Sequence, residues 1–64
     1  MQQGFNEGDE VRMSVTENKR RMFKNFTVKA AKLTSGHWKY QLNDENGNVY
    51  DGGKWFGEAD LRDP

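Results

Sequence analysis

The chain contains no cysteine, one histidine and one proline, and it has no long apolar run. Without cysteine it can form neither a disulfide nor a thiolate metal site, and His37 alone cannot build a zinc site. We therefore expect no metal and no cofactor. No stretch approaches the roughly 20 apolar residues that a membrane span needs, and the first residues lack the pattern of a signal peptide. These absences predict an intracellular protein without a membrane partner.

Catalytic patterns are also missing. Neither Ser14 nor Ser35 stands in the context of a nucleophile elbow. The neighbouring acids Glu58 and Asp60 belong to a segment that reads as a helical turn, where acidic residues are common. We therefore expect a chain that is not an enzyme.

The 64 residues suffice for one small domain, which buries only about 60% of the surface that its unfolded chain exposes. We expect a single domain over residues 1–64. Within it, residues 1–7 form an N-terminal arm and residues 62–64 a C-terminal tail.

Strand patterns dominate the first half of the chain. Residues 10–16 alternate polar and apolar side chains, which predicts a half-buried strand. Residues 17–23 break this period and predict a loop. Residues 24–33 predict a second strand. Its apolar positions change from even to odd numbers near residues 30–31, which predicts a β-bulge there. A helix over residues 26–33 is the alternative, but its neighbours are strands.

The second half continues the pattern. Residues 34–36 predict a turn, and residues 37–43 a third strand with Trp38, Tyr40 and Leu42 on one face. A further turn leads into a fourth strand through Val49 and Tyr50. Residues 57–61 predict a single helical turn that ends in a buried leucine.

The turn at Asn46-Gly47 decides which side chain of the fourth strand joins the core. A two-residue type I′ turn puts Val49 on the same face as Leu42. A three-residue turn with Gly47 in the left-handed region puts Tyr50 there. We favour the two-residue turn, because Asn-Gly is the pair that matches it best.

Eight aromatic residues are more than a small barrel needs in its core. Exposed aromatic side chains can bind a peptide or a cationic side chain. We therefore predict an exposed aromatic patch that binds a protein or peptide. Its candidate residues are Trp38, Tyr40, Tyr50, Trp55 and Phe56.

The formal net charge is zero, but the charges are segregated. Residues 12–39 carry eight cations against one acid, Glu17, and the two ends of the chain are acidic. This basic segment, over residues 19–39, supports an alternative function in nucleic-acid binding. Its candidate contacts are Lys19, Arg20, Arg21, Lys24, Lys29 and Lys32. If the acidic ends pack over the basic middle, only the peptide hypothesis survives. A third hypothesis is a structural or homo-oligomerising unit that pairs through a strand edge.

Three short motifs resemble SH3-like barrels of the Tudor, KOW or chromo-barrel kind. They are Gly8-Asp9-Glu10-Val11, Tyr40-Gln41-Leu42 with Asp44 and Gly47, and Glu58-Ala59-Asp60-Leu61. The resemblance implies an all-β fold, a small SH3-like barrel of four to five strongly bent antiparallel strands with a one-turn helix near the C-terminus. It also implies binding of methylated side chains, as in Tudor domains, or of RNA or protein, as in KOW domains. The Trp55-Phe56 pair departs from the usual cage pattern, so no cage residue is carried over.

Overall fold

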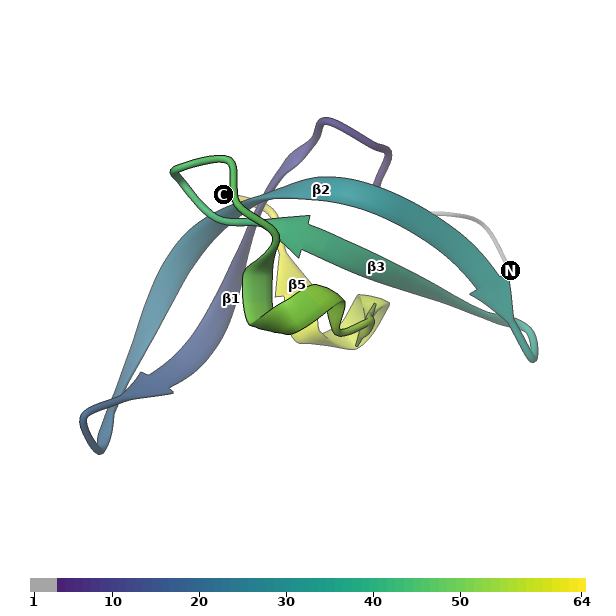
Figure 1. Ribbon diagram of the computed structural model, residues 1–64. Helices are drawn as coiled ribbons and strands as arrows, with labels where there is room; N and C mark the ends of the chain where they lie inside the picture. Colours follow the sequence, from purple (N-terminus) through teal and green to yellow (C-terminus); the bar gives the residue numbers. More distant parts are fainter. Residues whose placement is uncertain (1–3) are drawn as a thin grey trace.

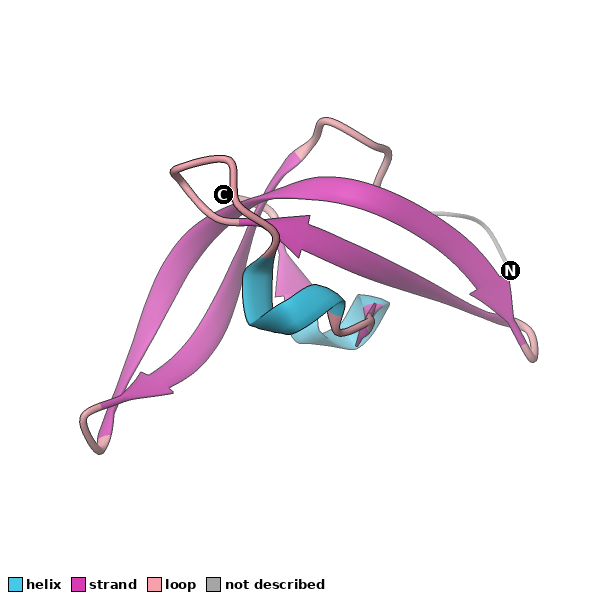
Figure 2. Cartoon of the chain, in the orientation of Figure 1, coloured by secondary structure: helices cyan, strands magenta, loops and turns pink. Residues whose placement is uncertain are grey.

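A computed structural model describes residues 4–64 of the chain as a single five-stranded antiparallel sheet (Figures 1 and 2). Its strands follow the spatial order β4-β3-β2-β1-β5. The strands are β1 (Glu10–Glu17), β2 (Arg20–Thr34), β3 (His37–Asn43), β4 (Phe56–Gly57) and β5 (Leu61–Arg62). Two short 3-10 helices are η1 (Tyr50–Gly53) and η2 (Glu58–Asp60). The predicted all-β class is confirmed.

The long strand β2 shapes the sheet because it pairs with β1 along its first half and with β3 along its second half. The register shifts between Val28 and Ala30, so that Lys29 is the extra residue of a β-bulge. A bulge bends the strand, and β2 arches over the molecule in Figure 1. The sheet thus curls into a barrel-like form, as predicted, and the two edge strands β4 and β5 do not pair with each other. The predicted bulge exists one residue earlier than expected, and the alternative helix does not form.

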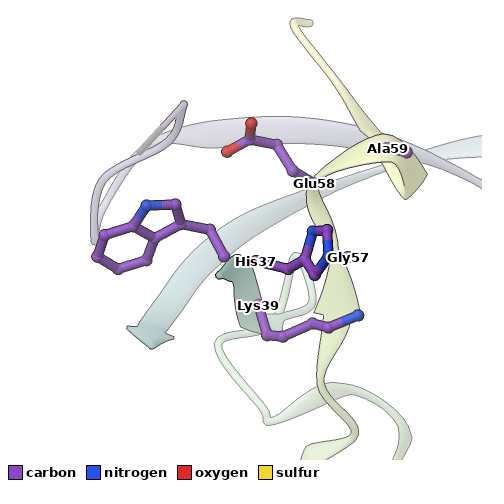
Figure 3. A pocket seen from close by; sticks show the side chains of 6 residues that line it. His37, Lys39, Gly57, Glu58 and Ala59 are labelled. Atoms are coloured by element: carbon purple, nitrogen blue, oxygen red, sulfur yellow. The ribbon is translucent and has the colours of Figure 1, made fainter. Parts of the chain in front are cut away.

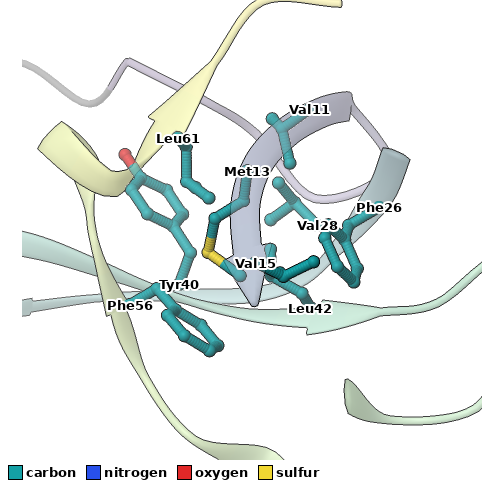
Figure 4. Packing of buried hydrophobic residues seen from close by; sticks show 9 residues of the cluster. All are labelled: Val11, Met13, Val15, Phe26, Val28, Tyr40, Leu42, Phe56 and Leu61. Atoms are coloured by element: carbon teal, nitrogen blue, oxygen red, sulfur yellow. The ribbon is translucent and has the colours of Figure 1, made fainter. Parts of the chain in front are cut away.

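The core lies on the concave side of the curled sheet (Figure 4). Alternation along the strands directs every second side chain inward, and this rule explains the buried set. That set comprises Val11, Met13, Val15, Phe26, Val28, Tyr40, Leu42, Phe56 and Leu61, all at most 8% exposed. The prediction of a half-buried first strand is confirmed, as is the shared face of Tyr40 and Leu42.

The segment 17–23, predicted to be a loop, instead forms the tip of a β-hairpin. Asn18 and Lys19 have φ values of 51° and 63°, as the two central residues of a type I′ turn require. β1 and β2 pair up to this turn, so Met22 and Phe23 are strand residues and are 38% and 50% exposed. The tip of the hairpin extends beyond the core. Because neither face of this tip is buried, its sequence does not alternate between apolar and polar residues.

The turn after β3 has the three-residue build, so the preference for a two-residue turn is wrong. Asn43 pairs with Val49, and Gly47 has a φ of 82°. The Asp44 side chain stabilises this longer turn, because its Oδ1 accepts hydrogen bonds from the backbone N–H groups of residues 46 and 48 at 2.9 and 3.0 Å. Tyr50 therefore packs against the core, and Val49 is 44% exposed. The predicted fourth strand is wrong, because Val49 forms an isolated bridge and Tyr50 begins η1.

Both ends of the described chain are held against the barrel. Leu61 closes the predicted helical turn and is buried, while Arg62 pairs with Arg12 in β5 and is not part of a tail. In the expected N-terminal arm, Phe5 packs edge-to-face on Tyr40 with ring centroids 5.6 Å apart. The first three residues of the arm lie outside the described residues. No helix in the described part of the chain is long and apolar enough to cross a membrane.

Candidate functional site

The predicted aromatic patch does not form one exposed surface. Tyr40 and Phe56 are core residues, and Trp38 and Tyr50 are partly buried against that core. Trp55 lies elsewhere, beneath the ammonium of Lys32, with Nζ 4.2 Å from the ring centroid. Four of the five rings therefore lie in the core or pack against it, and Trp55 lies apart from them beneath Lys32.

The six cations predicted to contact nucleic acid all lie on β2 or on the turn before it. They are Lys19, Arg20, Arg21, Lys24, Lys29 and Lys32. Because successive side chains of a strand point to opposite faces, they do not share one surface. Lys24 forms an ion pair with Glu17 at 2.6 Å, Lys32 covers Trp55, and Lys29 lies at the bulge. Only Arg21 points to the convex side in a cluster with other arginines.

That cluster lies on the outward side of β1, β2 and β5. Arg12 on β1 pairs directly with Arg62 on β5, and Phe23 on β2 pairs with Ser14, the next outward residue of β1. The guanidinium carbons of Arg12 and Arg62 lie 5.2 and 5.9 Å from the centroid of the Phe23 ring. Arg21 donates from Nε to the Ser14 hydroxyl at 2.9 Å. We call Arg12, Arg21, Phe23 and Arg62 the arginine–phenylalanine face.

The charges of this face are not neutralised by ion pairs. Within residues 4–64, the only ion pair with an N···O distance of 4.0 Å or less joins Lys24 to Glu17. Asp63 lines the same shallow recess as Arg12, Phe23 and Arg62 but makes no such pair. Like charges directly opposite each other on neighbouring strands are destabilising. The pairing of Arg12 with Arg62 is therefore a local conflict, which cation–π contacts with Phe23 offset in part.

A second recess lies where β3 begins. It is lined by His37, Trp38, Lys39, Gly57, Glu58 and Ala59. Figure 3 shows the Glu58 carboxylate turned away from His37 and Lys39. Glu58 Oε1 accepts hydrogen bonds from the Tyr40 hydroxyl at 2.6 Å and from the Gly4 N–H at 2.8 Å. Burial, and then the hydrogen bond with Glu58, raise the pKa of Tyr40. The hydrogen bonds of this carboxylate therefore hold the N-terminal arm to the barrel at the edge of the recess.

Three members of the arginine–phenylalanine face were not candidates at the sequence level: Arg12, Phe23 and Arg62. Arg12 and Arg62 are 50 positions apart in the chain, and only the β1–β5 register brings them together. Phe23 would have been found if the hairpin tip had been recognised, because the outward alternation of β2 then includes it. Among the described residues, no three histidine, aspartate or glutamate side chains gather as a metal site. Comparisons with protein-family models, with curated proteins and with solved structures find no match for this chain.

Proposed function

We propose that this chain is a non-catalytic module that binds single-stranded nucleic acid through the arginine–phenylalanine face. The observation that carries the proposal is the direct cross-strand pairing of Arg12 with Arg62 over an exposed phenylalanine, without an ion-paired acid. A conflict of this kind costs stability in the free protein, and an anionic ligand relieves it.

The chemistry of the face fits a nucleic-acid strand. Guanidinium groups bind phosphate oxygens in a bidentate manner and stack on planar groups, which ammonium groups do less well. Phe23, which is 50% exposed, offers a ring on which an unpaired base can stack. Such stacking contributes about 1–3 kcal/mol per base and tolerates any sequence. An exposed ring beside three arginines thus favours a single strand over a duplex, whose bases are already stacked.

Peptide binding by the original aromatic set is not retained as the main function, because Tyr40 and Phe56 are in the core. The acidic ends also form no ion pair with the cations of residues 19–39 within the described part of the chain. Arg21, the one cation of that set on the arginine–phenylalanine face, therefore keeps its charge available to an anionic ligand.

The test is fluorescence anisotropy with labelled single-stranded RNA and DNA oligonucleotides at several salt concentrations. Three phosphate contacts predict a slope of log K against log salt of about −2, since each contact to a single strand contributes about −0.7. Affinity should then fall roughly 20-fold between about 50 and about 200 mM salt. A duplex of the same sequence should bind more weakly.

Variants can distinguish binding at the arginine–phenylalanine face from attraction by positive charge anywhere on the protein. Arg12→Gln should lower the affinity and make the salt slope less steep by about 0.7, whereas Phe23→Ala should lower the affinity without changing the slope. Lys29→Gln is the matched control, because it removes one cation at the bulge, away from the face. Equal losses for Lys29→Gln and Arg12→Gln, or no binding at low salt, would contradict the proposal.

A further inference from the structure

One edge of β1 is half open. β5 pairs only with Arg12 and Met13, so residues 14–17 of β1 pair with β2 on one side and with no strand of the described chain on the other. The two-residue turn makes Glu17 and Arg20 a hydrogen-bonded pair, and such pairs alternate along an antiparallel ladder. The backbone N–H and C=O groups of Ser14 and Thr16 therefore point away from β2. Because Met13 pairs with Leu61, the N–H of Ser14 faces the C=O of Asp60, and Thr16 is the residue whose groups face the open edge.

A groove of about 480 Å³ runs beside this edge. We call it the seam, because it separates β1 from the segment that carries η1 and β4. Its aromatic residues are Tyr50, Trp55 and the largely buried Phe56, and its cations are Arg21, Lys54 and Arg62. Tyr50 and Phe56 lie with ring centroids 5.9 Å apart, and Lys54 Nζ is 5.5 Å from the Phe56 centroid. The volume is within the range of about 300–1,000 Å³ that is typical of binding sites.

The charges around the seam favour an acidic occupant. Its two acids are Asp51 and Asp60, and Oδ2 of Asp60 already accepts the Gly57 N–H at 3.1 Å. The three cations have no ion-pair partner in the described part of the chain. A second copy of the protein, paired through the same edge, would bring the arginines of both copies together. An extended acidic segment of another protein meets no such repulsion.

We infer that the open edge of β1 binds an extended acidic peptide, which adds to the sheet as a further strand beside residues 15–17. The peptide backbone bonds to the free N–H and C=O groups of Thr16. Its side chains alternate between the two faces of the sheet. Those on the convex side are acidic and face Arg21 and Arg62, and those on the concave side are apolar and contact Tyr50 and Trp55, which line the groove.

The first test uses an eight-residue peptide that alternates glutamate and valine, with a lysine–valine peptide as its counterpart. In an NMR titration of the full chain, the glutamate peptide should shift the backbone amide signal of Thr16. It should also slow the hydrogen exchange of this amide at least tenfold, because a free amide becomes a ladder donor. The lysine peptide should produce neither effect.

The second test removes the donor at the edge. Thr16→Pro deletes an N–H that points away from β2, and edge strands tolerate proline at such positions. This variant should lose roughly tenfold in peptide affinity, the equivalent of one to two hydrogen bonds, whereas Thr16→Val keeps the N–H and should bind like the original protein. The exchange measurement on the unsubstituted protein decides the matter if Thr16→Pro does not fold.

Three results would overturn the inference: equal binding of the lysine peptide, peptide binding without protection of the Thr16 amide, or concentration-dependent dimerisation through the edge. The inference does not depend on the proposed nucleic-acid function. Thr16→Pro leaves all three arginines of the face in place, so it should still bind an oligonucleotide. Failure of one proposal is therefore visible separately from failure of the other.

Discussion

The Tyr40 hydroxyl donates a 2.6 Å hydrogen bond to Oε1 of Glu58 and so links the middle of β3 to the helical turn before β5. The same carboxylate oxygen accepts the backbone N–H of Gly4. One acceptor thus connects three parts of the chain that are distant in sequence. In a domain whose core has few residues, such a connection is a large share of the free energy of unfolding.

Loss of this hydrogen bond should destabilise the domain. We expect Tyr40→Phe to lower the free energy of unfolding by about 1–2 kcal/mol, because the acceptor is charged and only partly buried. Urea denaturation followed by tryptophan fluorescence measures the change. Tyr50→Phe is the control, since the Tyr50 hydroxyl makes no hydrogen bond within the described residues, and it should leave stability nearly unchanged.

The raised pKa of Tyr40 predicts a loss of stability in alkali. Burial and the hydrogen bond to Glu58 raise this pKa above the ordinary value of 10.0, so the folded state holds the proton more tightly than the unfolded chain. The resulting stabilisation is complete below pH 10 and is lost as the pH rises through the higher pKa of the folded state. Denaturation midpoints measured across this range should fall more steeply for the original protein than for Tyr40→Phe. Identical pH profiles would show that other groups are responsible.

The turn between β1 and β2 should be open to improvement. Lys19 has a φ of 63°, a region that disfavours side chains with a Cβ atom, and Asn-Gly is the preferred type I′ pair. Lys19→Gly should therefore raise the free energy of unfolding by about 0.5–1 kcal/mol. Lys19→Ala removes the same charge but keeps the Cβ atom, and a gain of equal size there would attribute the effect to charge.

The three-residue turn after β3 predicts opposite sensitivities for two neighbours. Tyr50 packs on Phe26 with ring centroids 4.6 Å apart, whereas Val49 is 44% exposed. Tyr50→Ala should cost about 2–3 kcal/mol of stability and Val49→Ala less than about 0.5 kcal/mol. Denaturation of the two variants checks this order, and the reverse order would indicate a two-residue turn.

The strands that could be predicted from the sequence have one buried face, because such strands alternate apolar and polar residues. Val11, Met13 and Val15 mark β1, and Tyr40 with Leu42 marks β3, because each contributes every second side chain to the core. The bend in β2 could be inferred for the same reason, from the change in apolar alternation near residues 30–31, one position after the bulge at Lys29.

Elements outside the core could not be predicted in this way. The hairpin tip around Phe23 is exposed on both faces, so neither a helical nor a strand period marks it. The turn at Gly47 depends on hydrogen bonds to Asp44 that compete with the preference of Asn-Gly for a shorter turn. The candidate site depends on the register of β5 against β1, which is set by the packing of Leu61 and not by any local motif.

The pairing of Arg12 with Arg62 predicts that function and stability oppose each other at this position. Arg62→Glu replaces a like-charged cross-strand pair with an oppositely charged one, which should raise the free energy of unfolding by about 0.2–1 kcal/mol at low salt. The gain should shrink at about 1 M salt, where the screening length is about 3 Å. The same variant should bind a single-stranded oligonucleotide more weakly, since it puts an anion on the arginine–phenylalanine face. Lys29→Glu makes the same change in charge at the bulge and should produce neither effect. If Arg62→Glu lost both stability and binding, this arginine would stabilise the fold. The like-charge pair of Arg12 and Arg62 would then no longer support the proposed anionic ligand.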